Sequence, residues 1–163
     1  MSDTSSPRVA LSQLLSHDAV NLRLTGSQKD AVLVELVDQI KALRSQPEAR
    51  QTLLHALHER EQLHSTGIGD GIALPHARNA LVGLLDCPVL VFGRHEQGVP
   101  YGAIDGVSAR LFFLLVAPNV TLHLAMLARL SRILRDPKLR KALLAAESAE
   151  KVISLIGEAE AKI

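Results

Sequence analysis

Apolar residues recur along this chain at two different spacings, which predict helices and strands in turn. Helical spacing, with apolar side chains three or four residues apart, begins after Ser27, a possible N-cap, and continues through Ile40 to Leu43. Pro47 can occupy the first turn of a second helix, whose apolar stripe reaches Leu63. Charged residues separate the apolar positions in both segments, so each predicts a surface helix with one buried side.

Two continuous apolar runs, residues 88–92 and 109–116, have the length of β-strands. The second run is so uninterrupted that both of its faces must be covered, as in the centre of a sheet. Shorter apolar runs predict further strands at residues 20–22 and 72–74. We therefore expect a sheet built around residues 88–92 and 109–116.

The connections and the C-terminal third can be predicted from turn and capping residues. Residues 95–100 and 105–106 carry the glycine, proline and aspartate typical of turns. A long helix is predicted over residues 121–135, and Pro137 opens a shorter one. Ser148, followed by acidic residues, predicts the start of a last helix.

Strands interleaved with helices predict a layered α/β domain with a mixed central sheet flanked by helices. The chain has 163 residues, of which 47% are hydrophobic, enough for one well-packed core. Residues 1–8 are polar and are expected to be a disordered lead-in, and residues 9–15 can form a short helix. We expect a single domain over residues 9–163.

The charge balance and the single cysteine exclude several classes of function. With 18 basic and 17 acidic residues the formal net charge is +1, so no overall field attracts nucleic acid or an anionic membrane. Cys87 has no partner for an intrachain disulfide, which suits a reducing compartment. The start of the chain lacks the pattern of a secretory signal, and no apolar run approaches membrane-spanning length. We expect a cytoplasmic protein without nucleic-acid partners or membrane insertion.

The most informative pattern is a glycine-punctuated turn followed by a short apolar strand, Pro75 and His76. Glycines allow close backbone approach, so successive N–H groups can converge on an anion. Pro75 restricts the backbone before it, which predicts a rigidly held His76. Backbone donors beside a fixed imidazole suggest phosphoryl chemistry with the histidine as nucleophile. The N–H groups expected to bind the anion are those of Gly67, Ile68, Gly69 and Asp70.

A second histidine, His123, falls on the apolar face of the predicted helix 121–135, in its first turn. A helix N-terminus favours a neutral imidazole and attracts anions such as phosphate. Taken alone, His123 is also compatible with a core histidine whose hydrogen bonds are satisfied. A functional interpretation gains weight only because His76 needs a neighbour.

Other candidate residues have simpler interpretations. Arg60, one helical turn before the glycines, could clamp phosphate oxygens or be an ordinary surface arginine. His55, His58 and Glu59 share one turn, but a metal needs three or four converging ligands, and the zinc-protease pattern is absent. His64 is best interpreted as a solvated loop residue. The glycine spacing matches neither a P-loop nor a dinucleotide fingerprint, so we expect neither metal nor cofactor.

The string STGIGDGIALPH at residues 65–76, preceded by Arg60-Glu61 and followed by residues 103–106 and His123, resembles the enzyme IIA domain of the bacterial phosphotransferase system, fructose/mannitol type. The similarity extends from near Leu11 over most of the chain. As a stand-alone domain, the chain is most similar to the nitrogen-regulatory branch of that family.

This resemblance implies the mixed sheet of mannitol-type enzyme IIA, with residues 9–163 as the IIA domain. It implies that a small histidine phosphocarrier protein phosphorylates His76, that His123 hydrogen-bonds the phosphoryl group, and that Arg60 is a mobile arginine near the site. It further implies regulated target proteins, of the ion-transporter or sensor-kinase kind, as output.

We therefore expect a phosphotransferase with a phosphohistidine intermediate and a dominant regulatory role. Two alternatives remain open. The protein could be a sugar-specific enzyme IIA that passes its phosphate to a IIB component, or a docking regulator whose site is vestigial.

Overall fold

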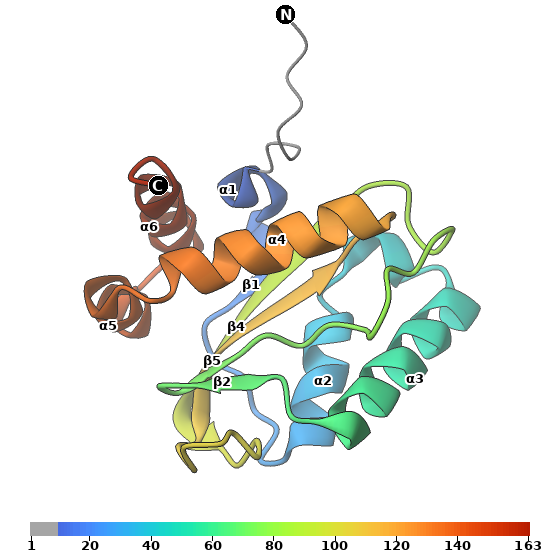
Figure 1. Ribbon diagram of the computed structural model, residues 1–163, viewed down its shortest axis with the longest axis horizontal. Helices are drawn as coiled ribbons and strands as arrows, with labels where there is room; N and C mark the ends of the chain where they lie inside the picture. Colours follow the sequence, from blue (N-terminus) through green and yellow to red (C-terminus); the bar gives the residue numbers. More distant parts are fainter. Residues whose placement is uncertain (1–9) are drawn as a thin grey trace, which may run out of the picture.

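The computed structural model describes residues 10–163, which form one mixed sheet between two groups of helices (Figure 1). The strand order is β1-β4-β5-β3-β2, with β1 parallel to β4, β3 parallel to β5, and the other pairs antiparallel. This confirms the predicted mixed sheet flanked by helices. The prediction for residues 1–8 lies outside the described residues. The strands are β1 (Val20–Asn21), β2 (Gly67–Gly69), β3 (Ile72–Ala73), β4 (Val89–Val99) and β5 (Ala109–Val116).

Each face of the sheet carries its own helical layer. Helices α2 and α3 cover one face, and α1, α4, α5 and α6 cover the other (Figure 1). The helices are α1 (Leu11–Leu14), α2 (Lys29–Val37), α3 (Pro47–Leu63), α4 (Val120–Ile133), α5 (Pro137–Ala145) and α6 (Ala149–Glu160), with 3-10 turns η1 (His17–Ala19) and η2 (Lys41–Leu43).

Strand β5 lies in the middle of the sheet and separates two hydrophobic cores. Phe113 points into the core under α4, whereas its neighbour Phe112 points into the core under α2 and α3, and neither ring is exposed. Successive side chains of a strand point to opposite faces, so a strand covered on both sides needs apolar residues throughout. This arrangement explains the unbroken apolar run and confirms the predicted central strand.

Helix α2 is shorter than predicted. It ends at Val37, and a separate 3-10 turn, η2, follows, so the prediction of one helix reaching Leu43 is wrong. Ile40 is extended, with φ −80° and ψ 101°, yet Ile40 and Leu43 are each 2% exposed in the same core. The apolar spacing persists across the break because both segments pack against one surface. The N-cap is Gln28 rather than Ser27.

Strand β4 is longer than predicted, so the expectation of a turn at residues 95–100 is wrong. Its pairing with β5 continues to Val99, but the register shifts between Arg94 and Val99. Gly98 has φ +90° within this irregular part, which accounts for turn-type residues inside a strand. The turn predicted at residues 105–106 is confirmed by a hydrogen bond from the Gly106 N–H to the Ala103 carbonyl, 2.9 Å.

The helix starts predicted from prolines and from Ser148 are confirmed, whereas the helix predicted over residues 9–15, whose first residue lies outside the described part, is observed as α1 from Leu11 to Leu14. Helices α3 and α5 begin at Pro47 and Pro137, and the Ser148 hydroxyl accepts a hydrogen bond from the Lys151 N–H at 3.1 Å at the start of α6. Helix α4 begins at Val120, one residue before the prediction. None of the helices between residues 10 and 163 combines the length and apolarity needed to cross a membrane.

Candidate active site

His76 stands where the chain leaves β3. The two residues between this strand and the histidine are held in place by the backbone: the Leu74 N–H donates to the Thr66 carbonyl at 3.0 Å, and the Pro75 carbonyl accepts from the Leu115 N–H at 3.1 Å. The segment therefore continues the sheet beside the end of β5. His76 thus follows a segment whose backbone is hydrogen-bonded on both sides.

The orientation of the His76 ring fixes its tautomer. Its Nδ1 lies 2.5 Å from the Leu74 carbonyl oxygen. Because a carbonyl oxygen can only accept, Nδ1 carries the proton, and Nε2 keeps a free electron pair. Burial lowers the pKa of His76, and the nearby positive charge of Arg60 and the ring of His123 lower it further, against the opposing effect of the Leu74 hydrogen bond. At neutral pH the ring is uncharged and Nε2 can act as a nucleophile.

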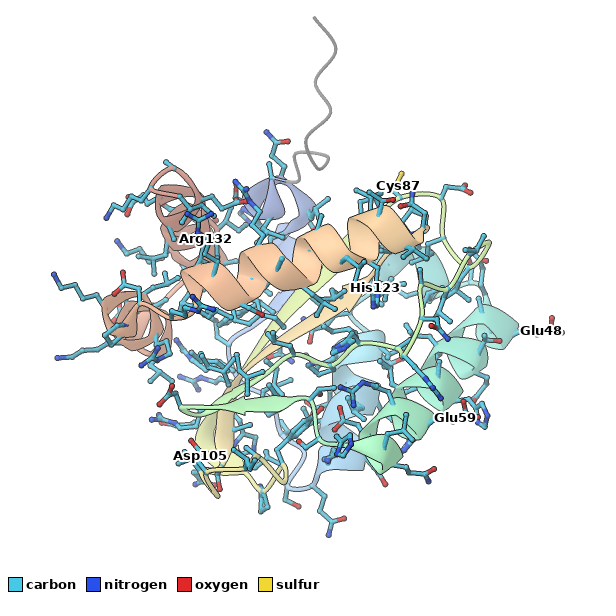
Figure 2. All side chains as sticks on the ribbon, viewed as in Figure 1. Glu48, Glu59, Cys87, Asp105, His123 and Arg132 are labelled. Atoms are coloured by element: carbon cyan, nitrogen blue, oxygen red, sulfur yellow. The ribbon has the colours of Figure 1, made fainter. Side chains whose placement is uncertain are left out.

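His123 comes to the same place from the first turn of α4. The centroids of the two imidazole rings are 5.7 Å apart, with an interplanar angle of 61°. His123 is 6% exposed, and burial lowers its pKa. The Asn119 side chain caps this helix by accepting the Leu122 N–H at 2.9 Å. In Figure 2, His123 is on the side of α4 that faces the sheet.

Arg60 belongs to the last turn of α3 and reaches the site from the opposite helical layer. Its Nη1 donates to the carbonyl of His64 at 2.6 Å, while its charge is close enough to lower the pKa of His76. The structure thus brings together His76, His123 and Arg60, as expected for the three side chains. It does so by converging a sheet end with one helix from each layer.

The backbone donors of the glycine segment do not join this group, which corrects the sequence interpretation. The Gly67 N–H donates to Ser65 Oγ at 3.0 Å, and the Asp70 N–H donates to the Asp105 carboxylate at 2.9 Å. Two of the four N–H groups that were expected to bind phosphate, those of Gly67 and Asp70, therefore already have acceptors.

The segment is instead a β-hairpin that points away from His76. Its turn has positive φ at Gly69 (+91°), Asp70 (+58°) and Gly71 (+78°). Ile68, Gly69 and Asp70 line a hollow beside Ser131, in the last turns of α4. At 1.5 Å per residue, Ser131 lies about 12 Å along the helix from His123. Figure 2 likewise places Asp105, which anchors this turn, well apart from His123.

The remaining histidines of α3 form isolated pairs. His55 contacts Glu59 at 2.7 Å, and His58 contacts Asp30 at 3.3 Å, all with exposed side chains. Within residues 10–163, no three His, Cys, Asp or Glu side chains are grouped as metal ligands. His64 is exposed, in keeping with the prediction of a loop residue.

The sequence interpretation missed a buried polar cluster next to the site. The Glu61 carboxylate accepts hydrogen bonds from Lys29 Nζ, from the Thr66 N–H and hydroxyl, and from the Tyr101 hydroxyl. Lys29 and Tyr101 are far from Glu61 in sequence, and no spacing pattern links them to Glu61 or to nearby Thr66. The only available signal was the adjacency of Glu61 to Arg60.

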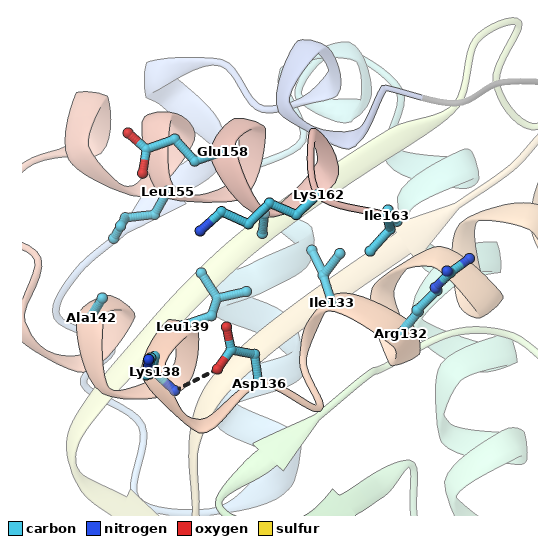
Figure 3. Close-up of a pocket in the computed structure, with 11 residues that line it drawn as sticks. Arg132, Ile133, Asp136, Lys138, Leu139, Ala142, Leu155, Glu158, Lys162 and Ile163 are labelled. Carbon is cyan, nitrogen blue, oxygen red and sulfur yellow. Dashed lines mark hydrogen bonds between the residues drawn. The ribbon is translucent and has the colours of Figure 1, made fainter.

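A separate hollow lies between α5 and α6 (Figure 3). Its walls include Leu139 and Leu155, with Lys138 and Glu158 at the rim. The hollow has no imidazole in its lining and does not extend to His76 or His123. The paired histidines are thus the better candidate for chemistry.

Comparison with known proteins agrees with this arrangement. The family model described as "Phosphoenolpyruvate-dependent sugar phosphotransferase system, EIIA 2" matches residues 13–159. The chain belongs to this family. The fold and the family predicted from the sequence are both confirmed.

Relatives of this EIIA domain carry two kinds of name. A fructose-specific EIIABC component of Bacillus subtilis is 37% identical over 151 residues, which are 91% of this chain but only 23% of that protein. A nitrogen regulatory protein of Bradyrhizobium diazoefficiens is 30% identical over 148 residues, covering 90% of this chain and 94% of the relative. The chain therefore spans about a quarter of the first relative and nearly all of the second.

Solved structures give the same division. The nitrogen regulatory protein IIA-Ntr of Neisseria meningitidis superposes with a TM-score of 0.78 at 28% identity, covering 89% of this chain and 97% of that one. The mannitol IIA of Escherichia coli superposes with a TM-score of 0.73 at 25% identity, covering 87% and 98%. The five-stranded sheet with its helical layers is the fold of both proteins.

Proposed function

We propose that His76 accepts a phosphoryl group from a phosphohistidine of a small histidine phosphocarrier protein, and that the phosphorylation state of this EIIA domain directs a regulatory output. The observation that carries the proposal is the Leu74 carbonyl at 2.5 Å from Nδ1 of His76, which leaves Nε2 unprotonated beside His123. We place this exchange in the cytoplasm.

In the transfer step, Nε2 of His76 forms a bond to phosphorus as the bond to the donor nitrogen breaks. The electron pair of the broken bond stays on the donor imidazole. The His76 ring gains positive character, which the Leu74 carbonyl stabilises through the Nδ1 proton. No other proton needs to move, so positioning and electrostatics account for the catalysis.

The groups available to the phosphoryl oxygens are side chains and a helix end rather than the glycine turn. His123 and the N-terminus of α4 come from one helical layer, and Arg60 comes from the other. The transition state spreads negative charge over the oxygens, and each placed donor can contribute about 2.7–4 kcal/mol. Ala77, Leu81 and Val116 form an apolar wall behind His123, which limits access of water that would hydrolyse the product.

The test is to incubate the protein with phosphoenolpyruvate, enzyme I and the phosphocarrier protein, and then to measure its intact mass. We expect one acid-labile phosphoryl adduct in the unaltered protein and none in His76→Ala. A protein that binds the phosphocarrier but gains no adduct would contradict the proposal and support a docking regulator with a vestigial site.

The regulatory output rests on the relatives named nitrogen regulatory protein, which match this chain over most of their length. Phosphorylation would add about −1.5 to −2 charges next to His123 and so change which surfaces can dock there. Regulated targets of the ion-transporter or sensor-kinase kind should be retained by one form only. Affinity capture with phosphorylated and with unmodified protein shows which targets each form retains.

The fructose-specific relatives favour a second candidate, a sugar-specific EIIA. Such a protein passes its phosphoryl group to a IIB component. Adding purified IIB domains to the phosphorylated protein decides between them, because rapid loss of the adduct to IIB identifies a sugar-specific role.

A further inference from the structure

The carboxylate of Glu61 is nearly enclosed and connects four segments of the chain. Its side chain is 6% exposed. It accepts hydrogen bonds from Lys29 Nζ at 3.1 Å, the Thr66 N–H at 3.1 Å and the Tyr101 hydroxyl at 3.0 Å, and also from the Thr66 hydroxyl. One buried group therefore fixes the end of α3 to the start of α2, to the residue before β2, and to the loop after β4.

A short path of hydrogen bonds leads from Glu61 to the ring of His76. Glu61 binds Thr66 through both its N–H and its hydroxyl. The Thr66 carbonyl accepts the Leu74 N–H at 3.0 Å, and the Leu74 carbonyl holds Nδ1 of His76 at 2.5 Å. Thr66 thus hydrogen-bonds both to Glu61 and to the residue whose carbonyl sets the tautomer of the nucleophile.

Glu61 also borders the other side of the site. It follows Arg60, which bends back to the His64 carbonyl at 2.6 Å, so the segment between α3 and β2 is fixed on its inner side by Glu61 and on its outer side by Arg60. Glu61 lies near enough for its charge to act on His76.

The partners of the Glu61 carboxylate satisfy both of its oxygens in this enclosed place. Lys29 supplies the compensating positive charge and also lies 4.5 Å from the centroid of the Tyr101 ring. Each of the two carboxylate oxygens accepts two hydrogen bonds. If Glu61 served only to attach α3 to the core, no hydrogen-bonded path from Glu61 to the His76 ring would be needed.

We infer that Glu61 is a positioning residue for phosphoryl acceptance: through Thr66 and Leu74 it holds the proton on Nδ1 of His76 and directs Nε2 outward. Glu61 does not contact the phosphoryl group. The kinetic part of this inference rests on the function proposed for His76, but the effect on the ring does not.

The test compares Glu61→Ala and Glu61→Gln with Glu59→Ala in the full chain. Glu59 is a matched control because it lies in the same turn of α3 with its side chain 65% exposed. Two quantities are measured: the phosphorylation rate at saturating phosphocarrier protein, and the Nδ1–H population of His76 from imidazole ¹⁵N shifts, assigned against His76→Asn.

We expect Glu61→Ala to slow the rate at saturating donor on the order of a hundredfold, with little change in the half-saturating donor concentration. The His76 ring should shift from the Nδ1–H tautomer to a mixture. Glu61→Gln should recover most of both, since its amide oxygen can accept from Lys29 and Thr66 while the two hydroxyls turn to accept from its NH₂ group. Glu59→Ala should match the unaltered protein.

Unchanged Nδ1–H population in a folded Glu61→Ala would overturn the inference, whatever the rate, and would make Glu61 a purely structural residue. If Glu61→Ala does not fold, Thr66→Val and Tyr101→Phe each remove one bond to the carboxylate, and the same measurement decides. If the unaltered protein accepts no phosphoryl group, the proposed function fails, while the ¹⁵N shifts still judge the role of Glu61.

Discussion

At the scale of single residues, the phosphoryl acceptance proposed for His76 depends on keeping one ring nitrogen free of a proton. The Leu74 carbonyl assigns the proton to Nδ1, and burial disfavours a second proton on Nε2. A charged ring would have no electron pair to offer. The surroundings of His76 therefore act on its protonation before any partner arrives.

The pH dependence of phosphoryl acceptance follows from this. Since burial lowers the pKa of His76, the rate should stay level as pH falls from 8 to about 6.5, the ordinary histidine value, and decline only below it. The folded ring binds its proton less tightly than the unfolded one, so its contribution to stability is full above about pH 6.5 and is lost on acidification. An NMR titration should place the His76 midpoint below that of an unstructured histidine peptide; a higher midpoint contradicts this assignment.

The role of His123 can be measured by its removal. We expect His123→Ala to keep the fold and to slow phosphorylation of His76 on the order of a hundredfold or more, because a donor to the phosphoryl oxygens is lost. Far-UV circular dichroism and a single-turnover rate are sufficient measurements. A folded variant with an unchanged rate would make His123 a core histidine without a catalytic role.

At the scale of elements, features that depend on neighbouring residues were predicted well, whereas contacts between distant parts of the chain were not. Helices with a proline or a serine at their start were placed within a residue or two because those signals are local. The ring of His123 was placed correctly by helical spacing. The glycine turn was misjudged because it adjoins His76 in sequence, whereas the extended segment between Gly71 and His76 separates them by about 3.3 Å per residue.

Replacing a glycine of this hairpin separates its structural role from a role in phosphate binding. Gly69→Ala should lower the free energy of unfolding by about 1–2 kcal/mol, since φ is +91° there and a Cβ would meet the Asp105 carboxylate at 3.0 Å. The phosphorylation rate of His76 should be unchanged. Gly83→Ala is the control, because φ is +85° with no atom near the new Cβ. A rate that falls with Gly69→Ala alone would restore the predicted phosphate nest.

A buried carboxylate also secures the N-terminal helix. Glu160 of α6 accepts the Leu11 N–H at 2.7 Å, the Ser12 N–H at 2.9 Å and Arg129 Nε at 2.7 Å. Burial alone would raise the pKa of Glu160, but these bonds outweigh it and lower the pKa. The sequence carried no signal for the contact between Glu160 and Leu11, since they are 149 positions apart.

Removing that charge should loosen α1. Glu160→Gln should cost about 1–3 kcal/mol of unfolding free energy, measured by urea denaturation, whereas exposed Glu158→Gln should cost little. Because the folded pKa is lowered, the stability due to Glu160 is complete above its unfolded pKa of about 4.3 and is lost as pH falls through the folded value. Equal stability of the two variants at pH 7 would contradict this role.

At the scale of the whole molecule, the sequence predicted the layers and the central strand but not how the site is assembled from them. His76 comes from the sheet, His123 from the layer of α4, and Arg60 from the layer of α3. Hydrophobic patterns report which face of an element is buried, but they do not report which elements meet at a corner. For the same reason, hydrophobic patterns could not predict the Glu61 cluster, whose four residues come from separate segments.

The residues of the site come from elements on both sides of β5. The geometry of the site therefore depends on the integrity of the entire domain. Loosening either helical layer, by heat, denaturant or a competing protein, would displace His123 or Arg60 from His76 even if the sheet stayed intact. Phosphate uptake should then cease early, at a point where spectroscopic signals of secondary structure still look native. The phosphoryl acceptance proposed for His76 would then be confined to copies in which both helical layers are in place.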